Sequence, residues 1–353
     1  MDTYIREQIT NLRHTLHACP EISGQEKQTK ETLQAFLKAH TSLELNDCGE
    51  GFYAAHREGT GNGITFRADY DALALPKGGA AHLCGHDGHA SVLCGLALML
   101  EGKTVGRDVF LLFQPAEETG AGAYPCTELF EKEQITEIYG AHNLPGFAFG
   151  QVYTRTGTFA CGSEGMTLKF HGKATHAAYP ENGLSPAHAV GELLRQVPEF
   201  LSLECYTGMV LCTVIGVQMG EKAFGAAAAD AEVWLTLRAE HGKDLEVLRE
   251  TVQRTAKDLA EADGLGFGME EQDVFPATEN DPVCAEKVVK KCDGKYLEVP
   301  MRWSEDFGHY LMKCKGAFFG IGAGENHPAL HTITYEYPDD LLEKTAEAFW
   351  KLI

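Results

Sequence analysis

Four short apolar runs in this chain are each followed at once by polar side chains that can take part in chemistry. In one-letter code they read ITF before RADYD (64–71), VFLLF before QPAEE (109–118), IYGA before H (138–142) and AFFGI before GAGENH (317–327). Apolar runs of this length with helical patterns between them are typical of buried strands in an α/β sheet. Ligands of such sheets bind beyond the carboxyl ends of the strands. We therefore expect Asp71, Glu117, Glu118, His142 and a late histidine to gather at one edge of the sheet.

The middle of the chain has a different pattern from its two ends. A length of 353 residues favours two domains over one core. The expected order is a strand at 166–171, a helix from Ser185-Pro186 to about 203, strands at 209–218 and 229–239, a helix at 243–262 and a strand at 265–272. This βαββαβ order is ferredoxin-like. We predict an inserted α+β domain at residues 163–273 within an α/β/α domain formed by residues 1–162 and 274–353.

The composition argues against several kinds of partner and location. A formal net charge of −21 disfavours binding to nucleic acid or to an anionic membrane surface. The first residues lack the apolar core of a signal peptide, and no apolar run is long enough to span a bilayer. The 11 cysteines are scattered without a framework spacing, which is typical of reduced thiols. We expect a cytoplasmic protein.

The octapeptide HLCGHDGH (82–89) concentrates three histidines, a cysteine and an aspartate. In an extended segment alternate residues share a face, so His82, Cys84 and His86 can point the same way. A helical pattern at 88–100 follows, which places Asp87 and His89 in its first turn.

Thiolate and imidazole are good ligands for zinc and related divalent ions. Two other interpretations compete: a catalytic thiol, which needs a base and an orienting partner, and histidines that only cap a helix. The carboxylates and His142 at other strand ends favour a binuclear metal site.

These motifs carry a family resemblance. The chain resembles the aminoacylase and carboxypeptidase-G superfamily of binuclear metallopeptidases, and is most similar to its amidohydrolase branch of N-acyl-amino-acid, hippurate and indoleacetyl-amino-acid hydrolases. The matching motifs occur in order along nearly the whole chain: LRHTLHACPEISGQE (12–26), FRADYDAL (66–73), HLCGHDGH (82–89), FQPAEETGAGA (113–123), GAHNLP (140–145), GKATHAAYPENGLSP (172–186), SEDF (304–307) and ALHT (329–332). The resemblance implies a catalytic metallopeptidase domain and an inserted lid or dimerisation domain.

The resemblance also implies a set of site residues. Two divalent ions, zinc or manganese with cobalt as a further candidate, would be held by Cys84, His86, Glu118, His142 and His331. His331 is favoured over His327 because the family places a leucine just before the ligand, as Leu330 stands here. Glu117 would be the general base. Adjacent residues that leave a strand diverge, so one carboxylate can bind metal while its neighbour faces the substrate.

Three further residues have a functional and a structural interpretation each. Asp71 would orient a metal ligand, or only cap a turn. His176 would stabilise the oxyanion, often from the partner subunit of a homodimer, or be a surface histidine. Arg238 would recognise a substrate carboxylate, or be a surface strand arginine.

The chain departs from the family pattern at two places in the expected pocket. Only six residues (76–81) stand where the family has a longer loop, and residues 225–230 lack the family's substrate asparagine. The expected function is metal-dependent hydrolysis of the amide bond in small N-acyl amino acids. The alternatives are a dipeptidase or carboxypeptidase of the same superfamily, and a metal-bound binding protein without activity. The CGHDGH form of the motif favours amide hydrolysis.

Overall fold

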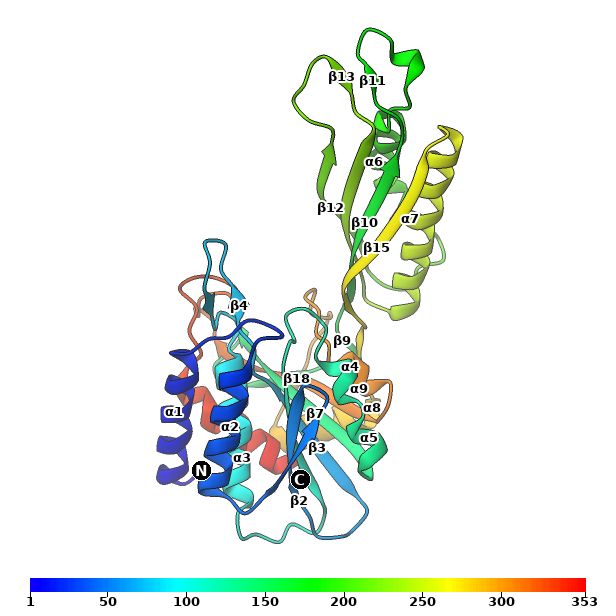
Figure 1. The fold of residues 1–353 in the computed structure, drawn as a ribbon. Coiled ribbons are helices and arrows are strands. Elements are labelled where there is room, and N and C mark those ends of the chain that lie inside the picture. Colours follow the sequence, from blue (N-terminus) through cyan, green and yellow to red (C-terminus); the bar gives the residue numbers. More distant parts are fainter. The chain divides into compact units, whose positions relative to one another are not determined.

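A mixed eight-stranded sheet runs through the larger of two units in the computed structural model, which describes residues 1–353 (Figure 1). Unit 1 contains Met1–Phe159, Thr278–Met301 and Glu305–Ile353. Unit 2 contains Ala160–Ala277 and Arg302–Ser304. None of the helices is both long and apolar enough to cross a membrane.

The four central strands of the unit 1 sheet are parallel. The sheet order is β1-β2-β6-β3-β7-β18-β8-β17, with β6, β3, β7 and β18 parallel to one another. The strand bounds are β1 Glu44–Cys48, β2 Gly51–His56, β3 Gly63–Asp69, β6 Val109–Gln114, β7 Ile135–Pro145, β8 Val152–Thr154, β17 Lys295–Tyr296 and β18 Gly316–Gly324. Two small ladders pair β4 (Leu73–Ala74) with β5 (Ala80–Ala81) and β9 (Gly157–Ala160) with β16 (Thr278–Asn280). The parallel strands bring their carboxyl ends to one edge.

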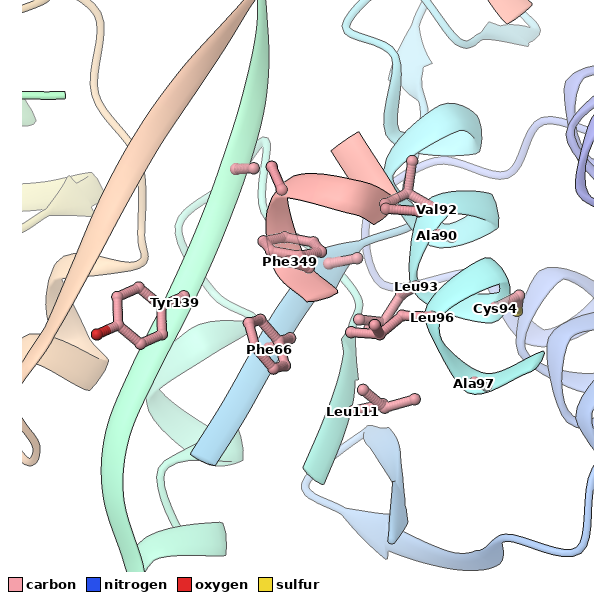
Figure 2. Packing of buried hydrophobic residues seen from close by; sticks show 14 of the residues in the cluster. Phe66, Ala90, Val92, Leu93, Cys94, Leu96, Ala97, Leu111, Tyr139 and Phe349 are labelled. Carbon is pink, nitrogen blue, oxygen red and sulfur yellow. The ribbon is translucent and has the colours of Figure 1, made fainter. Parts of the chain in front are cut away.

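Helix α3 (His86–Leu100) lies at the centre of the unit 1 core. It packs against β3 and against α1, α2 and α10, and α1 to α3 lie side by side (Figure 1). Leu93 and Leu96 of α3 point toward Phe66, Leu111 and Phe349 (Figure 2). The helices of this unit are α1 Thr3–His17, α2 Lys27–His40, α3, α4 Ala123–Cys126, α5 Leu129–Lys132, α8 Pro282–Cys292, α9 Gly308–Leu311 and α10 Asp339–Leu352. Burial on both sides explains why α3 is apolar nearly all round.

Unit 2 is a four-stranded antiparallel sheet with two helices. Its sheet order is β12-β14-β10-β15, which is the ferredoxin-like strand order. Helices α6 and α7 cover the sheet face that carries the apolar core. The bounds are β10 Gly162–His171, β11 Thr175–His176, the 3₁₀ helix Pro180–Asn182, α6 Ala187–Phe200, β12 Val210–Met219, β13 Ala226–Ala227, β14 Asp230–Ala239, α7 Gly242–Ala262 and β15 Gly266–Phe275.

The predicted α/β fold class is confirmed, and the ends of several elements differ from expectation. Helix α6 begins at Ala187, with Pro186 as its cap residue, and ends at Phe200 instead of near 203. Residues 275–282 contain β16 and the start of α8. Asp281 caps α8 by accepting hydrogen bonds from the amides of Val283 and Cys284, both at 3.0 Å. The lid or dimerisation role of unit 2 stays a prediction.

Candidate metal centre

The polar residues of unit 1 gather where the parallel strands end. Asp69 is the last residue of β3, and His142 lies near the end of β7. Glu117 and Glu118 follow β6 after a turn at Ala116, which has a positive φ of 52°. The Ala116 carbonyl accepts the amides of residues 121 and 122, so the turn is closed on itself. The edge expected from the strand pattern therefore collects these side chains.

The octapeptide enters α3 two residues earlier than the sequence pattern suggests. His86 is the first helical residue, so the expectation of an extended segment through residue 86 and a helix from 88 is wrong. Gly85 adopts a φ of 98°, and a Cβ at this position would lie 2.6 Å from the Tyr335 hydroxyl oxygen. Glycine alone allows this close left-handed turn. Cys84 and His86 meet across the turn.

His86 has one ring nitrogen engaged and the other directed into the cluster. Its Nδ1 lies 2.9 Å from Asp71 Oδ1. Its buried Nε2 has no hydrogen-bond partner and lies 3.8 Å from the nearest carboxylate oxygen of each of three neighbours, Asp69, Glu117 and Glu118. A neutral imidazole held at Nδ1 presents its Nε2 lone pair as a ligand.

Asp71 is itself fixed on two sides. Its Oδ2 accepts hydrogen bonds from Ser23 Oγ at 2.7 Å and from the Glu118 amide at 3.0 Å. The same carboxylate that holds His86 therefore also holds the backbone of the glutamate pair.

The cluster also contains Cys84, His142 and His331. Cys84 Sγ lies 3.4 Å from His142 Nε2, while His142 Nδ1 hydrogen bonds to the Asn143 carbonyl at 2.8 Å. His331 Nε2 lies 3.6 Å from Glu118 Oε1. His331 has a positive φ of 62°, and its amide donates to the Leu83 carbonyl at 2.8 Å.

The donor atoms form overlapping groups that could each hold a cation. Within each group the candidate ligand atoms lie within 4.8 Å of one another. Three such groups are Cys84 with His86 and His142, Cys84 with Glu118 and His331, and His86 with Glu117 and Glu118. Because these groups share residues, they lie next to one another. Thiolate, imidazole and carboxylate together suit zinc and neighbouring transition metals.

The electrostatics of the cluster favour positive ions. Burial raises the pKa of the Cys84 thiol well above its usual value, and the carboxylates of Glu118 and Glu117 raise it further. Burial and the charge of Glu305 likewise raise the pKa of Glu117. Burial opposes protonation of His86, but the carboxylates around it, Asp69 foremost, raise its pKa to about 10. Without cations the site is too rich in negative charge to keep all its acids ionised.

A buried arginine network lies beneath the glutamate pair. Arg67 is 2% exposed and donates to Gln114 Oε1, Asp69 Oδ2 and Asp306 Oδ1, each at 2.7 Å. Glu305 Oε1 lies 2.9 Å from the same guanidinium. The sequence interpretation gave no role to this network. An arginine inside an otherwise apolar strand is the signal for it, because a buried guanidinium needs carboxylate partners.

The remaining candidates lie elsewhere. His327 Nε2 hydrogen bonds to the Glu336 carbonyl at 2.8 Å and belongs to none of the candidate groups. Buried His82 lacks hydrogen-bond partners at both ring nitrogens and stacks on His17. His176 and Arg238 belong to unit 2. His176 follows the end of β10 that pairs with the start of β14, whereas Arg238 is near the end of β14, so the two belong to opposite ends of the unit 2 sheet.

Comparison with known proteins identifies the family. Residues 65–353 match the model of peptidase family M20/M25/M40. The chain belongs to this family of hydrolases. Hippurate hydrolase of Campylobacter jejuni is 27% identical over 371 residues, covering 99% of this chain and 96% of that protein. The resemblance that the motifs carried is confirmed.

One further relative supports the same conclusion, and one solved structure shares the fold. N-acetyldiaminopimelate deacetylase of Exiguobacterium sibiricum is 27% identical and covers 95% of both chains. The fold is shared with Bacillus subtilis YXEP, described as a dinuclear metal-binding peptidase. The TM-score is 0.82 at 23% identity, and the match covers 99% of this chain and 98% of that one.

Proposed function

We propose that this protein hydrolyses the amide bond of small N-acyl amino acids with the help of two divalent metal ions. One observation carries the proposal: His86 Nε2 and Glu118 Oε1 are both buried, lack a hydrogen-bond partner and lie 3.8 Å apart. Buried polar atoms are rarely left unpaired unless a ligand or ion completes them. Metal ions would bind these two unpaired atoms, which supports metal binding in a member of this family.

Five side chains would hold the ions: Cys84, His86, Glu118, His142 and His331. Zinc and manganese are the first candidates and cobalt the next, because the set mixes soft sulfur, imidazole and carboxylate donors. When bound, such ions lower the pKa of a water molecule and polarise a carbonyl group. Asp71 orients His86 through its 2.9 Å contact with Nδ1.

Glu117 is the proposed general base. Its carboxylate lies beside the ligand atoms, 3.8 Å from His86 Nε2, and is 6% exposed. It takes the proton of the attacking water and returns it to the nitrogen of the leaving amine. Burial and the charge of Glu305 raise the pKa of Glu117 above that of an ordinary glutamate, which is the direction that a general base requires.

The substrate class rests on the relatives and on Arg238. The named substrates of both curated relatives, hippurate and N-acetyldiaminopimelate, are N-acyl amino acids. Arg238 donates to the neutral hydroxyl of Ser304 at 2.5 Å, and burial lowers its pKa. A partly desolvated guanidinium with a neutral partner suits the free carboxylate of an amino-acid substrate.

A homodimer is the proposed assembly, with unit 2 as the contact. Strand β12 is at the edge of its sheet and exposes Val214, Ile215, Val217 and Met219. Apolar, unpaired edge strands tend to pair with a second copy. His176 is at the opposite end of unit 2 from Arg238. The proposed oxyanion role of His176 therefore fits service to a second copy of the chain.

A substrate screen tests the function. Protein stripped by a chelator is reloaded with manganese, zinc or cobalt and offered N-acetyl amino acids, N-benzoyl amino acids and dipeptides. We expect turnover of the N-acyl compounds that disappears on chelation and returns with metal. Preferential turnover of dipeptides would replace this function by a peptidase activity. Tight metal binding with no turnover of any class would contradict catalysis.

A further inference from the structure

His89 is the third histidine of the octapeptide, and both of its ring nitrogens are already engaged. Nδ1 lies 2.6 Å from Asp69 Oδ1, and Nε2 lies 2.6 Å from Asn143 Oδ1. The side chain is 4% exposed. Although His89 forms a candidate cation group with Asp69 and His86, a role as ligand would require it to give up one of these two short contacts.

The two partners of His89 are anchored in turn. Asp69 accepts from Arg67 through its other oxygen at 2.7 Å. Asn143 donates from Nδ2 to the Tyr335 hydroxyl at 2.6 Å. The result is one hydrogen-bonded chain that joins the end of β3, the first turn of α3, strand β7 and the segment before α10. His89 is the only link between its two halves that these contacts provide.

This chain touches two of the proposed metal ligands. The His89 ring centroid lies 4.6 Å from that of His142, in an edge-on arrangement, and 5.4 Å from that of His86. Asn143, which bonds to His89 through its side chain, also binds His142 Nδ1 through its carbonyl at 2.8 Å. A shift of Asn143 therefore changes the direction of His142 Nε2.

We propose that His89 is a positioning residue that bridges Asp69 and Asn143 and so fixes the His86 and His142 rings for metal binding. The inference rests on the proposed function, because it requires ions held by these two histidines. Contacts behind metal ligands typically change metal affinity by about 10- to 100-fold when removed.

Cobalt binding tests the bridge without any substrate. Chelator-treated protein is titrated with Co²⁺, and visible absorption reports the ligand geometry while elemental analysis gives the stoichiometry. His89→Phe keeps a ring but removes both polar contacts. We expect it to bind Co²⁺ about 10- to 100-fold more weakly and to change the absorption bands.

Two partial variants and one control sharpen the result. His89→Asn places an amide near the Nδ1 position and keeps the Asp69 contact, whereas His89→Gln places one near Nε2 and keeps the Asn143 contact. Each of these two variants should weaken Co²⁺ binding less than His89→Phe does. If His89→Phe does not fold, these two variants provide the test. His82→Phe is the control, because His82 is a buried histidine of the same octapeptide without hydrogen-bond partners.

The outcomes separate this inference from the proposed function. If the wild-type protein fails to bind Co²⁺, the proposed metal-dependent function is wrong. If the wild type binds and the His89 variants match its affinity and spectrum, only the bridge is refuted. An equal loss in His82→Phe would also refute it, since the effect would then come from core packing.

Discussion

Replacing Glu118 by glutamine is expected to stabilise the metal-free protein against unfolding and to lose this advantage when metal is present. The Glu118 side chain is 11% exposed, and its Oε1 has no hydrogen-bond partner. Burial raises its pKa to about 7, with His86 opposing and Asp71 adding to the rise. At pH 8 without metal the ionised carboxylate therefore destabilises the folded state.

The two magnitudes are comparable and opposite in sign. One pKa unit corresponds to about 1.4 kcal/mol, so a carboxylate whose pKa rises from 4.5 to about 7 destabilises the folded state by about 3 kcal/mol when it is ionised. Glutamine has the same shape and no charge, so the metal-free variant should gain most of that amount. With metal in excess, a hundredfold loss of affinity would remove about 2.7 kcal/mol of metal-linked stabilisation. The advantage of the variant should therefore disappear when metal is present.

Denaturant unfolding at pH 8, with chelator in one series and zinc or manganese in the other, measures both free energies. Glu117→Gln is the matched control, because it changes the adjacent residue in the same way. It should keep its metal content and its stability relative to wild type should not depend on metal, while kcat falls about 10²–10⁴-fold through loss of the base.

Two results would refute the reasoning. If Glu118→Gln retains full metal content and is stabilised equally in both series, Glu118 is not a ligand. If Glu117→Gln retains most of its kcat, the proposed hydrolytic mechanism is wrong.

Three further predictions concern other positions. Cys84→Ser should lower metal content in elemental analysis, and full occupancy would exclude Cys84 as a ligand. His176→Ala should lower kcat with metal content and melting temperature intact, and a monomer in light scattering would exclude a role across subunits. Glu164 is 5% exposed, and burial raises its pKa from 4.5 to about 7, so the folded state favours its protonated form. Its contribution to stability should therefore fall as pH rises through that window, and Glu164→Gln should exceed wild type by about 1–3 kcal/mol at pH 8 but not at pH 4 in chemical unfolding.

The central strands were predictable because burial on both faces produces continuous apolar runs. β3, β6, β7 and β18 contain the four runs of the sequence pattern. The start of α3 was not predictable in the same way. The sequence pattern begins the helix at Gly88, whereas the structure begins it at His86, directly after the left-handed turn at Gly85 that the close approach of Tyr335 requires.

The sequence indicates only some of the residues in the buried Arg67 network beneath the site. Arg67, Asp69 and Asp71 alternate along β3 and its end, so one face of a buried strand carries charge. That alternation indicates a buried ionic network. Its partners could not be found by local pattern, because Asp306, which accepts from Arg67, is 239 residues away in sequence.

His327 and His331 are distinguished by their positions in the fold and not by their residue type. Both histidines follow β18 within a few residues, and residue type alone does not distinguish them. The structure gives His331 a left-handed backbone whose amide bonds to Leu83, the residue before Cys84. That hydrogen bond ties the late histidine to the octapeptide and leaves its ring beside Glu118, whereas His327 is turned toward the Glu336 carbonyl. Since this bond joins residues far apart in the chain, the position of His331 is a consequence of the assembled edge of the sheet and not of its local sequence.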